Sequence, residues 1–170
     1  MIAIEREDEG GPGAALFIGV LGCAGLGATA GIDSGMFAVA HDAAVLPMAV
    51  ALLTVLLVPA LFVAASLSGL AIRLPDLGSA VAEGLRASGI ASLGLIGPVL
   101  FLLASTDSSA VSRLLVSAVL LFVAVLGLRA IYVRLFRDAL PFVTGLVLYL
   151  CWSLVFLGIG AKVVLQTLVI

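Results

Sequence analysis

The side chains best suited to chemistry are one histidine and a few carboxylates that fall between apolar stretches. His41 and Asp42 are adjacent, while Asp33 and Asp107 lie in other connecting segments. Histidine and carboxylate side chains together can bind zinc and other divalent metals. The chain has a single histidine, however, and therefore lacks the i, i+4 histidine pair of a metal-binding helix. We expect solvated side chains at these positions, with no metal ion or other cofactor.

Hydroxyl groups inside the apolar stretches are the second set of polar side chains. Such groups can line a substrate path, but in helical bundles they more often bond to their own backbone or to a neighbouring helix. No Asp or Glu lies at the centre of an apolar stretch, where a proton-coupled pump normally needs an ionisable group. The sequence also has no nucleophile and base pair, so we predict that the protein is not an enzyme. The hydroxyl-bearing residues are Thr54, Ser66, Ser88, Ser92, Thr144 and Ser153.

The composition predicts a polytopic membrane protein. Apolar residues make up 64% of the 170 residues and charged residues only 11%, against about 25% charged residues in soluble domains. The bilayer is therefore the expected surroundings of most side chains. No basic patch for nucleic acid is present, and no nucleic-acid partner is expected. Cys23 and Cys151 both fall in apolar runs, where a free thiol behaves as a small hydrophobe.

The longest uncharged stretch, Ala44 to Leu70, marks a transmembrane helix. Its 27 residues can cross a hydrocarbon core of about 30 Å with some tilt or bending. Pro47 suits the first turn of a helix, so we expect this span to begin close to it. Pro59 lies in mid-span and has no N–H for the carbonyl of Val55, which predicts a kink.

Four further apolar stretches complete the prediction of an all-α bundle with five transmembrane helices, two of them bent at proline. The second bend is expected at Pro98, and Thr54 and Ser92 are plausible donors to the carbonyls that the two prolines leave free. Residues 36–46 are too short to span, and residues 77–86 alternate apolar and charged side chains, so both segments are expected at the membrane surface. The expected spans are residues 14–32, 46–72, 87–104, 114–133 and 139–161.

The N-terminal segment differs from the rest of the chain. Residues 1–13 combine four carboxylates with a Gly-Gly-Pro-Gly sequence, a composition typical of a flexible acidic tail. Residues 14–170 are expected to form a single transmembrane domain. Val20-Leu21-Gly22-Cys23 loosely resembles a lipoprotein cleavage site, but the acidic start and the leucine before the glycine favour a retained span.

The first span carries a small residue at every fourth position over five positions. Residues at this spacing share one face of a helix, and small side chains there let another helix approach closely. The helix that packs on this stripe belongs either to the same chain or to a partner subunit, and the first alternative is favoured because a small bundle needs internal contacts. The stripe consists of Ala15, Gly19, Cys23, Gly27 and Gly31.

Basic residues are distributed unequally between the two sides of a five-span bundle. Six fall on the N-terminal side, and only Arg113 and Lys162 fall on the other. Positive charge is retained in the cytoplasm, so we expect the N-terminus there and the C-terminus outside. Several residues at span ends are expected to anchor the helices at the interfaces: Arg129, Tyr132, Arg134, Arg137 and Lys162.

The chain from about Val45 to the C-terminus resembles a family of small bacterial inner-membrane proteins related to the Yip-type membrane proteins. The segments that carry the resemblance are VLPMAVALLTVLLVPALFVAASLSG, GPVLFLLAST, LLFVAVLGLRAIY and WSLVFLGIGAKVV. Gly97 stands where that family has alanine, Leu102 where it has an aromatic residue, and Lys162 where it usually has glutamine. The resemblance implies a helical bundle in the bacterial inner membrane and supplies no catalytic residues.

The small-residue stripe and the two mid-span prolines, Pro59 and Pro98, are thus the most distinctive features of the sequence. They favour a non-catalytic membrane scaffold or accessory subunit that packs with itself or with a protein partner, with the first span as the expected contact. The alternative is a permease-like subunit or small channel of a transport system. Detection of a stoichiometric partner or of a homo-oligomer would distinguish the two.

Overall fold

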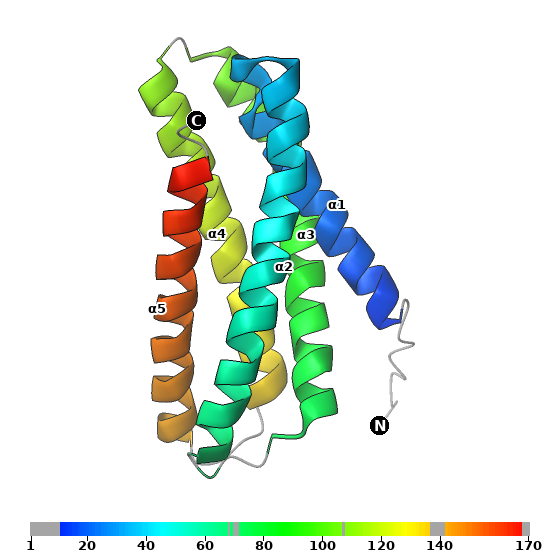
Figure 1. Ribbon diagram of the computed structural model, residues 1–170, viewed down its shortest axis with the longest axis vertical. Helices are drawn as coiled ribbons and strands as arrows, with labels where there is room; N and C mark the ends of the chain where they lie inside the picture. The colour runs from blue at the N-terminus through cyan, green and yellow to red at the C-terminus, as the bar shows by residue number, and fades with distance from the viewer. Residues whose placement is uncertain (1–10, 68, 70–71, 107, 137–141, 168–170) are drawn as a thin grey trace, which may run out of the picture.

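The computed structural model of the protein is a bundle of long α-helices (Figure 1). It describes residues 11–67, 69, 72–106, 108–136 and 142–167. All five α-helices in these ranges are long and apolar enough to cross a membrane, which confirms the predicted all-α class and the five membrane-spanning helices. The elements are α1 (Pro12–Ala30), the short 3-10 helix η1 (Ile32–Ser34), α2 (Met36–Leu67), α3 (Leu74–Ala104), α4 (Ser109–Phe136) and α5 (Phe142–Thr167).

The expected start of the second span at Pro47 is wrong. α2 begins at Met36, directly after Gly35, whose φ of 99° favours glycine, and continues through both Pro47 and Pro59. Residues 36–46 are therefore helical and continuous with the span. The physical reason is tertiary packing, because this segment lies against α1, and such contacts outweigh the backbone hydrogen bond that Pro47 removes.

The expected separation of residues 77–86 from the third span is also wrong. α3 is a single helix of 31 residues that starts with Leu74-Pro75 and ends at Ala104. Leu77 and Ala80, in the segment expected at the surface, are 1% and 0% exposed. Because their apolar face is buried in the bundle, this segment is held as a continuation of the span.

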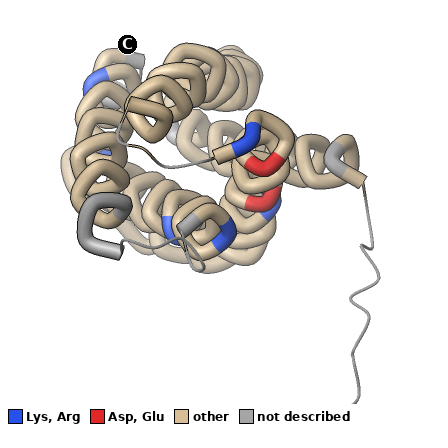
Figure 2. The backbone as a smooth tube through the Cα atoms, turned by 90° about the horizontal axis from the view of Figure 1, so that it is seen from below, with Lys and Arg blue, Asp and Glu red and all other residues tan. Residues whose placement is uncertain are grey.

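The five helices form a closed ring, since each of them packs on two neighbours. α1 lies between α2 and α3, α3 packs on α4, α4 packs on α5, and α5 returns to α2. The contacts of α1 with α3 and of α5 with α2 join helices that are not consecutive in the chain. Figure 2, which views the molecule from below, shows this arrangement of the helices.

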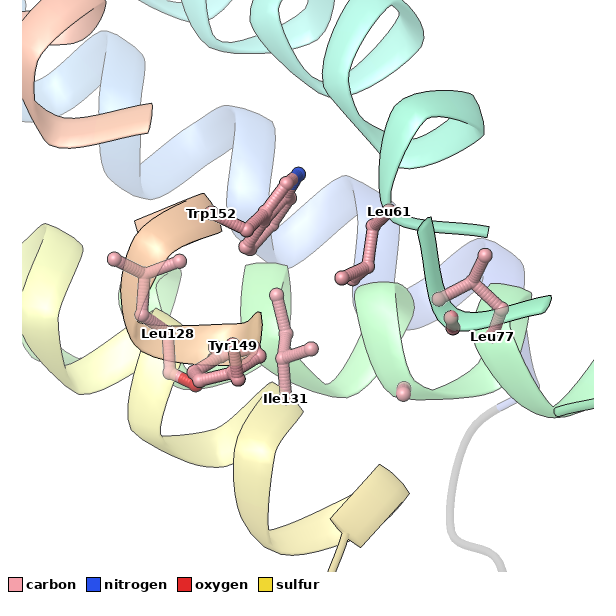
Figure 3. Close-up of a cluster of buried hydrophobic side chains, with 8 residues drawn as sticks. Leu61, Leu77, Leu128, Ile131, Tyr149 and Trp152 are labelled. Atoms are coloured by element: carbon pink, nitrogen blue, oxygen red, sulfur yellow. The ribbon is translucent and has the colours of Figure 1, made fainter. Parts of the chain in front are cut away.

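The lower end of the ring, as drawn in Figure 1, is filled by a hydrophobic cluster to which four helices contribute. Trp152 and Leu61 lie across from each other in this cluster, and Tyr149 lies beside Leu128 and Ile131 (Figure 3). A smaller cluster of Val99, Leu103 and Val116 joins α3 to α4 nearer the other end. The buried members of the lower cluster are Leu61, Ala65, Leu77, Ala80, Leu128, Ile131, Tyr149 and Trp152.

Charged side chains on the described helices lie towards the two ends of the bundle. Arg113 and Arg129 are 16 positions apart on α4, which places them about 24 Å apart along the axis. Both side chains are exposed and can extend outward to the headgroups of a bilayer with a core of about 30 Å. The helix bounds put Arg113 and Lys162 near the upper end and Arg73, Arg129 and Arg134 near the lower end, while Arg86 lies about 18 Å along α3 from its start at Leu74.

The alternating helix directions give the first testable prediction. Reporter fusions after Arg134 and after Ser108 should fall on opposite sides of the membrane, because α4 connects the two positions. The fusion after Arg134 is expected in the cytoplasm, since the basic residues gather at that end. Paired phosphatase and fluorescent-protein fusions measure the location of each site. Location of both fusions on the same side would contradict the arrangement.

Candidate functional site

α1 and α3 approach each other more closely than any side chain at their crossing would allow. A Cβ atom added to Gly22 would lie 2.6 Å from the Cα atom of Gly89. A Cβ atom added to Gly89 would lie 2.8 Å from the Cα atom of Gly19. Because the neighbouring atoms are backbone atoms, neither clash can be relieved by turning a side chain. The two helices therefore touch through their backbones.

The predicted small-residue stripe is buried within the chain along its whole length. Its members Ala15 and Cys23 are 6% and 8% exposed. A Cβ atom on Gly19 would lie 3.2 Å from the Cβ atom of Leu85 on α3, and one on Gly31 would lie 2.6 Å from the carbonyl carbon of Ala38 on α2. The stripe thus packs on α3 in one part and on α2 in the other.

This burial leaves no room for a partner subunit on the stripe itself. Gly27 faces the backbone of Asp42 and Ala43 in α2, so the upper part of the stripe is also occupied. The outer face of α1 is exposed instead, at Leu16, Phe17, Val20 and Leu21. The alternative in which the stripe packs on another protein is therefore wrong for this conformation.

Sequence reasoning missed the second close crossing, between α3 and α4. A Cβ atom on Gly84 would lie 3.0 Å from the carbonyl oxygen of Gly127. The hydroxyl of Ser88, one turn further along α3, donates to the carbonyl oxygen of Val123 at 3.4 Å. The sequence signal was present, because small residues recur at the same spacing of four in α3: Ala80, Gly84, Ser88 and Ser92.

Aromatic side chains connect α5 to α4 and α2. The ring centroids of Tyr132 and Tyr149 are 5.2 Å apart, those of Tyr149 and Trp152 5.7 Å, and those of Trp152 and Phe156 5.6 Å. The indole N–H of Trp152 donates to the carbonyl oxygen of Leu57 at 2.9 Å. Tyr132 was expected to anchor the interface, but it is half-buried and packs on Tyr149.

The phenol of Tyr149 makes the corresponding link to α4. It donates a hydrogen bond to the carbonyl oxygen of Leu128. Tyr149 is 5% exposed and Trp152 is 9% exposed, so both polar groups are satisfied inside the bundle. Two buried donors of α5 thus hold this helix to both of its neighbours in the ring.

A cavity of about 100 Å³ lies inside the ring and is lined by residues from all five helices. Cys23 of α1, Thr54 of α2, Ser88 and Ser92 of α3, and Trp152 of α5 face it, while α4 contributes apolar residues and Gly127. Since each helix supplies part of the wall, all five helices meet around this cavity.

Two of the hydroxyl groups considered in the sequence donate to the backbone of their own helix, which is the preferred interpretation of such groups. Thr54 donates to the carbonyl oxygen of Val50 at 2.8 Å, and Ser66 donates to that of Phe62 at 2.9 Å. The expectation that Thr54 donates to the carbonyl of Val55 is wrong, because its single hydroxyl hydrogen is directed one turn further back.

Pro59 and Pro98 lie well inside α2 and α3 and are both exposed on the outer surface of the bundle. Each proline leaves the carbonyl four residues earlier without its usual donor. The bends expected at these two residues stay predictions.

The side chains considered for metal binding are not brought together. His41 Nδ1 lies 3.0 Å from Asp42 Oδ1 on the outer part of α2, and the His41 ring stacks on Phe37 at 6.4 Å. Asp107 and the side chain of Asp33 lie outside the described part of the chain. Among the described residues, no three His, Cys, Asp or Glu side chains are placed to hold a metal ion.

The remaining predicted anchors lie where the sequence suggested, as far as the structure describes them. Arg129, Arg134 and Lys162 are exposed. Arg86, twelve residues after the start of α3 at Leu74, approaches Glu83 at 3.9 Å. Arg137 and most of the acidic tail, residues 1–10, lie outside the described residues.

Fold and composition together define the class as a multi-pass helical membrane protein. Comparison of the chain with protein-family models, with curated proteins and with solved structures finds no match. The resemblance to Yip-type proteins accordingly stays a prediction based on the quoted segments.

Proposed function

We propose that the protein is a non-catalytic scaffold or accessory subunit of the bacterial inner membrane. It acts through helix packing with a second copy or with a partner protein, and its N-terminus lies in the cytoplasm. The outer face of α1, with Leu16, Phe17, Val20 and Leu21, is the part of the first span that such a partner would meet.

The observation that carries this proposal is the use of the internal polar side chains. Trp152, Tyr149 and Ser88 each donate to a backbone carbonyl of another helix. Interhelical hydrogen bonds of this kind, together with glycine contacts, stabilise a fixed arrangement of membrane helices. A bundle in which these three donors link neighbouring helices is suited to keeping a fixed arrangement of its helices.

A partner-retaining purification tests the proposal. The full chain is extracted with its surrounding lipid, without crosslinking, and native mass spectrometry measures the mass of the complex. We expect one stoichiometric partner or a defined homo-oligomer. Phe17→Ala on the outer face of α1 should reduce that species, whereas Phe101→Ala on the exposed face of α3 is the matched control. A strictly monomeric chain would contradict a scaffold that acts by association.

A permease-like subunit or small channel is the second candidate, and the cavity between the five helices favours it. Below that cavity, the ring is filled by the hydrophobic cluster at its lower end. This filled interior favours the scaffold over a permease or channel. Purified protein in liposomes is therefore expected to give no flux of ions or small solutes above that of empty liposomes.

Pro98→Ala provides a prediction that separates the two candidates. The substitution restores a donor to the carbonyl of Gly94 and removes a cost of about 3 kcal/mol for proline in a helix interior, so α3 should straighten. We expect normal membrane insertion and a changed packing of α3, measured by protease resistance and thermal unfolding. A stable Pro98→Ala protein that loses a solute flux present in the wild type would favour the permease.

A further inference from the structure

The cavity has a wall that is almost entirely apolar. It lies among Val50, Val58, Leu85, Leu120 and Phe156, which come from four of the five helices. Its volume is about 100 Å³ and it is partly open rather than fully enclosed, and an apolar cavity of about 150 Å³ is large enough to bind benzene or xenon.

The polar atoms around the cavity are largely committed to the protein. Thr54 donates to Val50, Ser88 donates to Val123, and the indole N–H of Trp152 donates to Leu57. A buried water needs two to four polar partners, and these three groups have already used their hydrogens. Among the described residues, no Asp, Glu, Lys, Arg or His side chain lines the cavity, so a charged occupant would find no counter-charge there.

We propose that this cavity is a binding site for a small, uncharged, apolar molecule or for the end of a hydrocarbon chain. Both sources share the same chemistry, because a short hydrocarbon segment presents only van der Waals contacts to such a wall. Cys23 of α1 and Ser92 of α3 also line the site, and the thiol of Cys23 behaves as a small, polarizable hydrophobe. This inference does not depend on a partner protein, and it concerns the isolated chain.

The chain carries its own reporter for this site. Trp152 is the single tryptophan of the sequence, and it lines the cavity. Xenon is a heavy atom that quenches indole fluorescence on contact. With the purified protein in lipid nanodiscs, increasing xenon pressure should therefore produce a saturable loss of Trp152 fluorescence, above the linear background from xenon dissolved in the lipid.

Matched variants on α4 test whether the saturable quenching of Trp152 fluorescence comes from xenon bound in the cavity. Ala124 lines the cavity and Ala118 is exposed on the same helix. Ala124→Leu fills the space and should abolish the saturable quenching, while Ala118→Leu should leave it unchanged. Leu120→Ala enlarges the cavity and should strengthen quenching by xenon, which provides a test even where the filled variant does not fold.

Lipids with brominated chain ends distinguish the two sources of the ligand. Quenching by these lipids that is lost in Ala124→Leu and kept in Ala118→Leu would assign the site to a lipid chain end. Quenching by xenon without an effect of the brominated lipids would assign it to a free apolar molecule. Either result supports the apolar site. Absence of any saturable quenching, or equal quenching in Ala124→Leu and Ala118→Leu, would overturn it.

Discussion

Gly89→Leu is expected to separate α1 from α3 and to destabilise the bundle by about 3 kcal/mol or more. A Cβ atom at this position would lie 2.8 Å from the Cα atom of Gly19, and the closest atoms around it belong to the backbone of α1. Backbone atoms cannot change rotamer, so the clash is relieved only by moving the whole helix. Thermal or SDS-induced unfolding, followed by circular dichroism in a fixed detergent, measures the loss.

Gly94→Leu is the control for this substitution. Gly94 lies on the same helix, five residues further on, and a Cβ atom there would have no atom within 4 Å. Leucine also gains about 1 kcal/mol over glycine in helix propensity, so this variant should be neutral or more stable. Equal unfolding midpoints for Gly89→Leu and Gly94→Leu would show that the α1 and α3 backbones are not in contact.

The number of spans was predictable because bilayer thickness sets a length that the apolar stretches either reach or do not reach. The starts of α2 and α3 were not predictable from the same rule. Residues 36–46 contain His41 and Asp42 and are followed directly by Pro47, a pattern typical of a surface segment. Their helical conformation depends on contact with Gly27 and Gly31 of α1, and no local pattern reports that contact.

The small-residue stripe was predictable as a buried face of α1, but the helices that pack on it were not. Spacing of four finds residues on one side of a helix, whereas the position of the closest approach depends on how two helices cross. The backbone of α3 at Gly89 meets α1 at Gly19, which belongs to the stripe, and at Gly22, which does not. Gly89 could be identified as a contact only once the position of α1 was known, because a single glycine in a membrane helix does not indicate which helix packs on it.

The cavity could not be predicted from the sequence by any of these patterns. Its wall combines Cys23 with residues that are 23 to 133 positions away in the chain, from Leu46 to Phe156. Empty volume is what remains after all the side chains between five helices have been placed, so it depends on every crossing at once. Of the residues in its wall, Thr54, Ser88 and Ser92 were considered for a substrate path because of their hydroxyl groups, but residue type alone does not indicate an empty volume.

Trp152→Ala is the second substitution with a large expected effect, a loss of about 3–5 kcal/mol in the free energy of unfolding. Its side chain packs on Tyr149 and Phe156, and its N–H bonds to the carbonyl oxygen of Leu57 at 2.9 Å. Truncation would remove these contacts and join the vacated space to the existing cavity, which already borders the indole. Surrounding helices cannot close such a void without giving up their own contacts.

Two further variants separate packing from hydrogen bonding at this residue. Trp152→Phe keeps one aromatic ring and removes the N–H together with part of the indole, so it should cost more than the about 0.5–1.5 kcal/mol of a hydrogen bond alone but less than Trp152→Ala, because the Leu57 carbonyl retains its partner within α2. Phe101→Ala truncates an aromatic side chain that is 72% exposed on α3 and should change stability little. Unfolding is followed by circular dichroism, since the variants at 152 lack the fluorophore. If Trp152→Ala unfolds at the same midpoint as Phe101→Ala, then Trp152 faces the lipid and the ring of helices is not closed between α5 and α2.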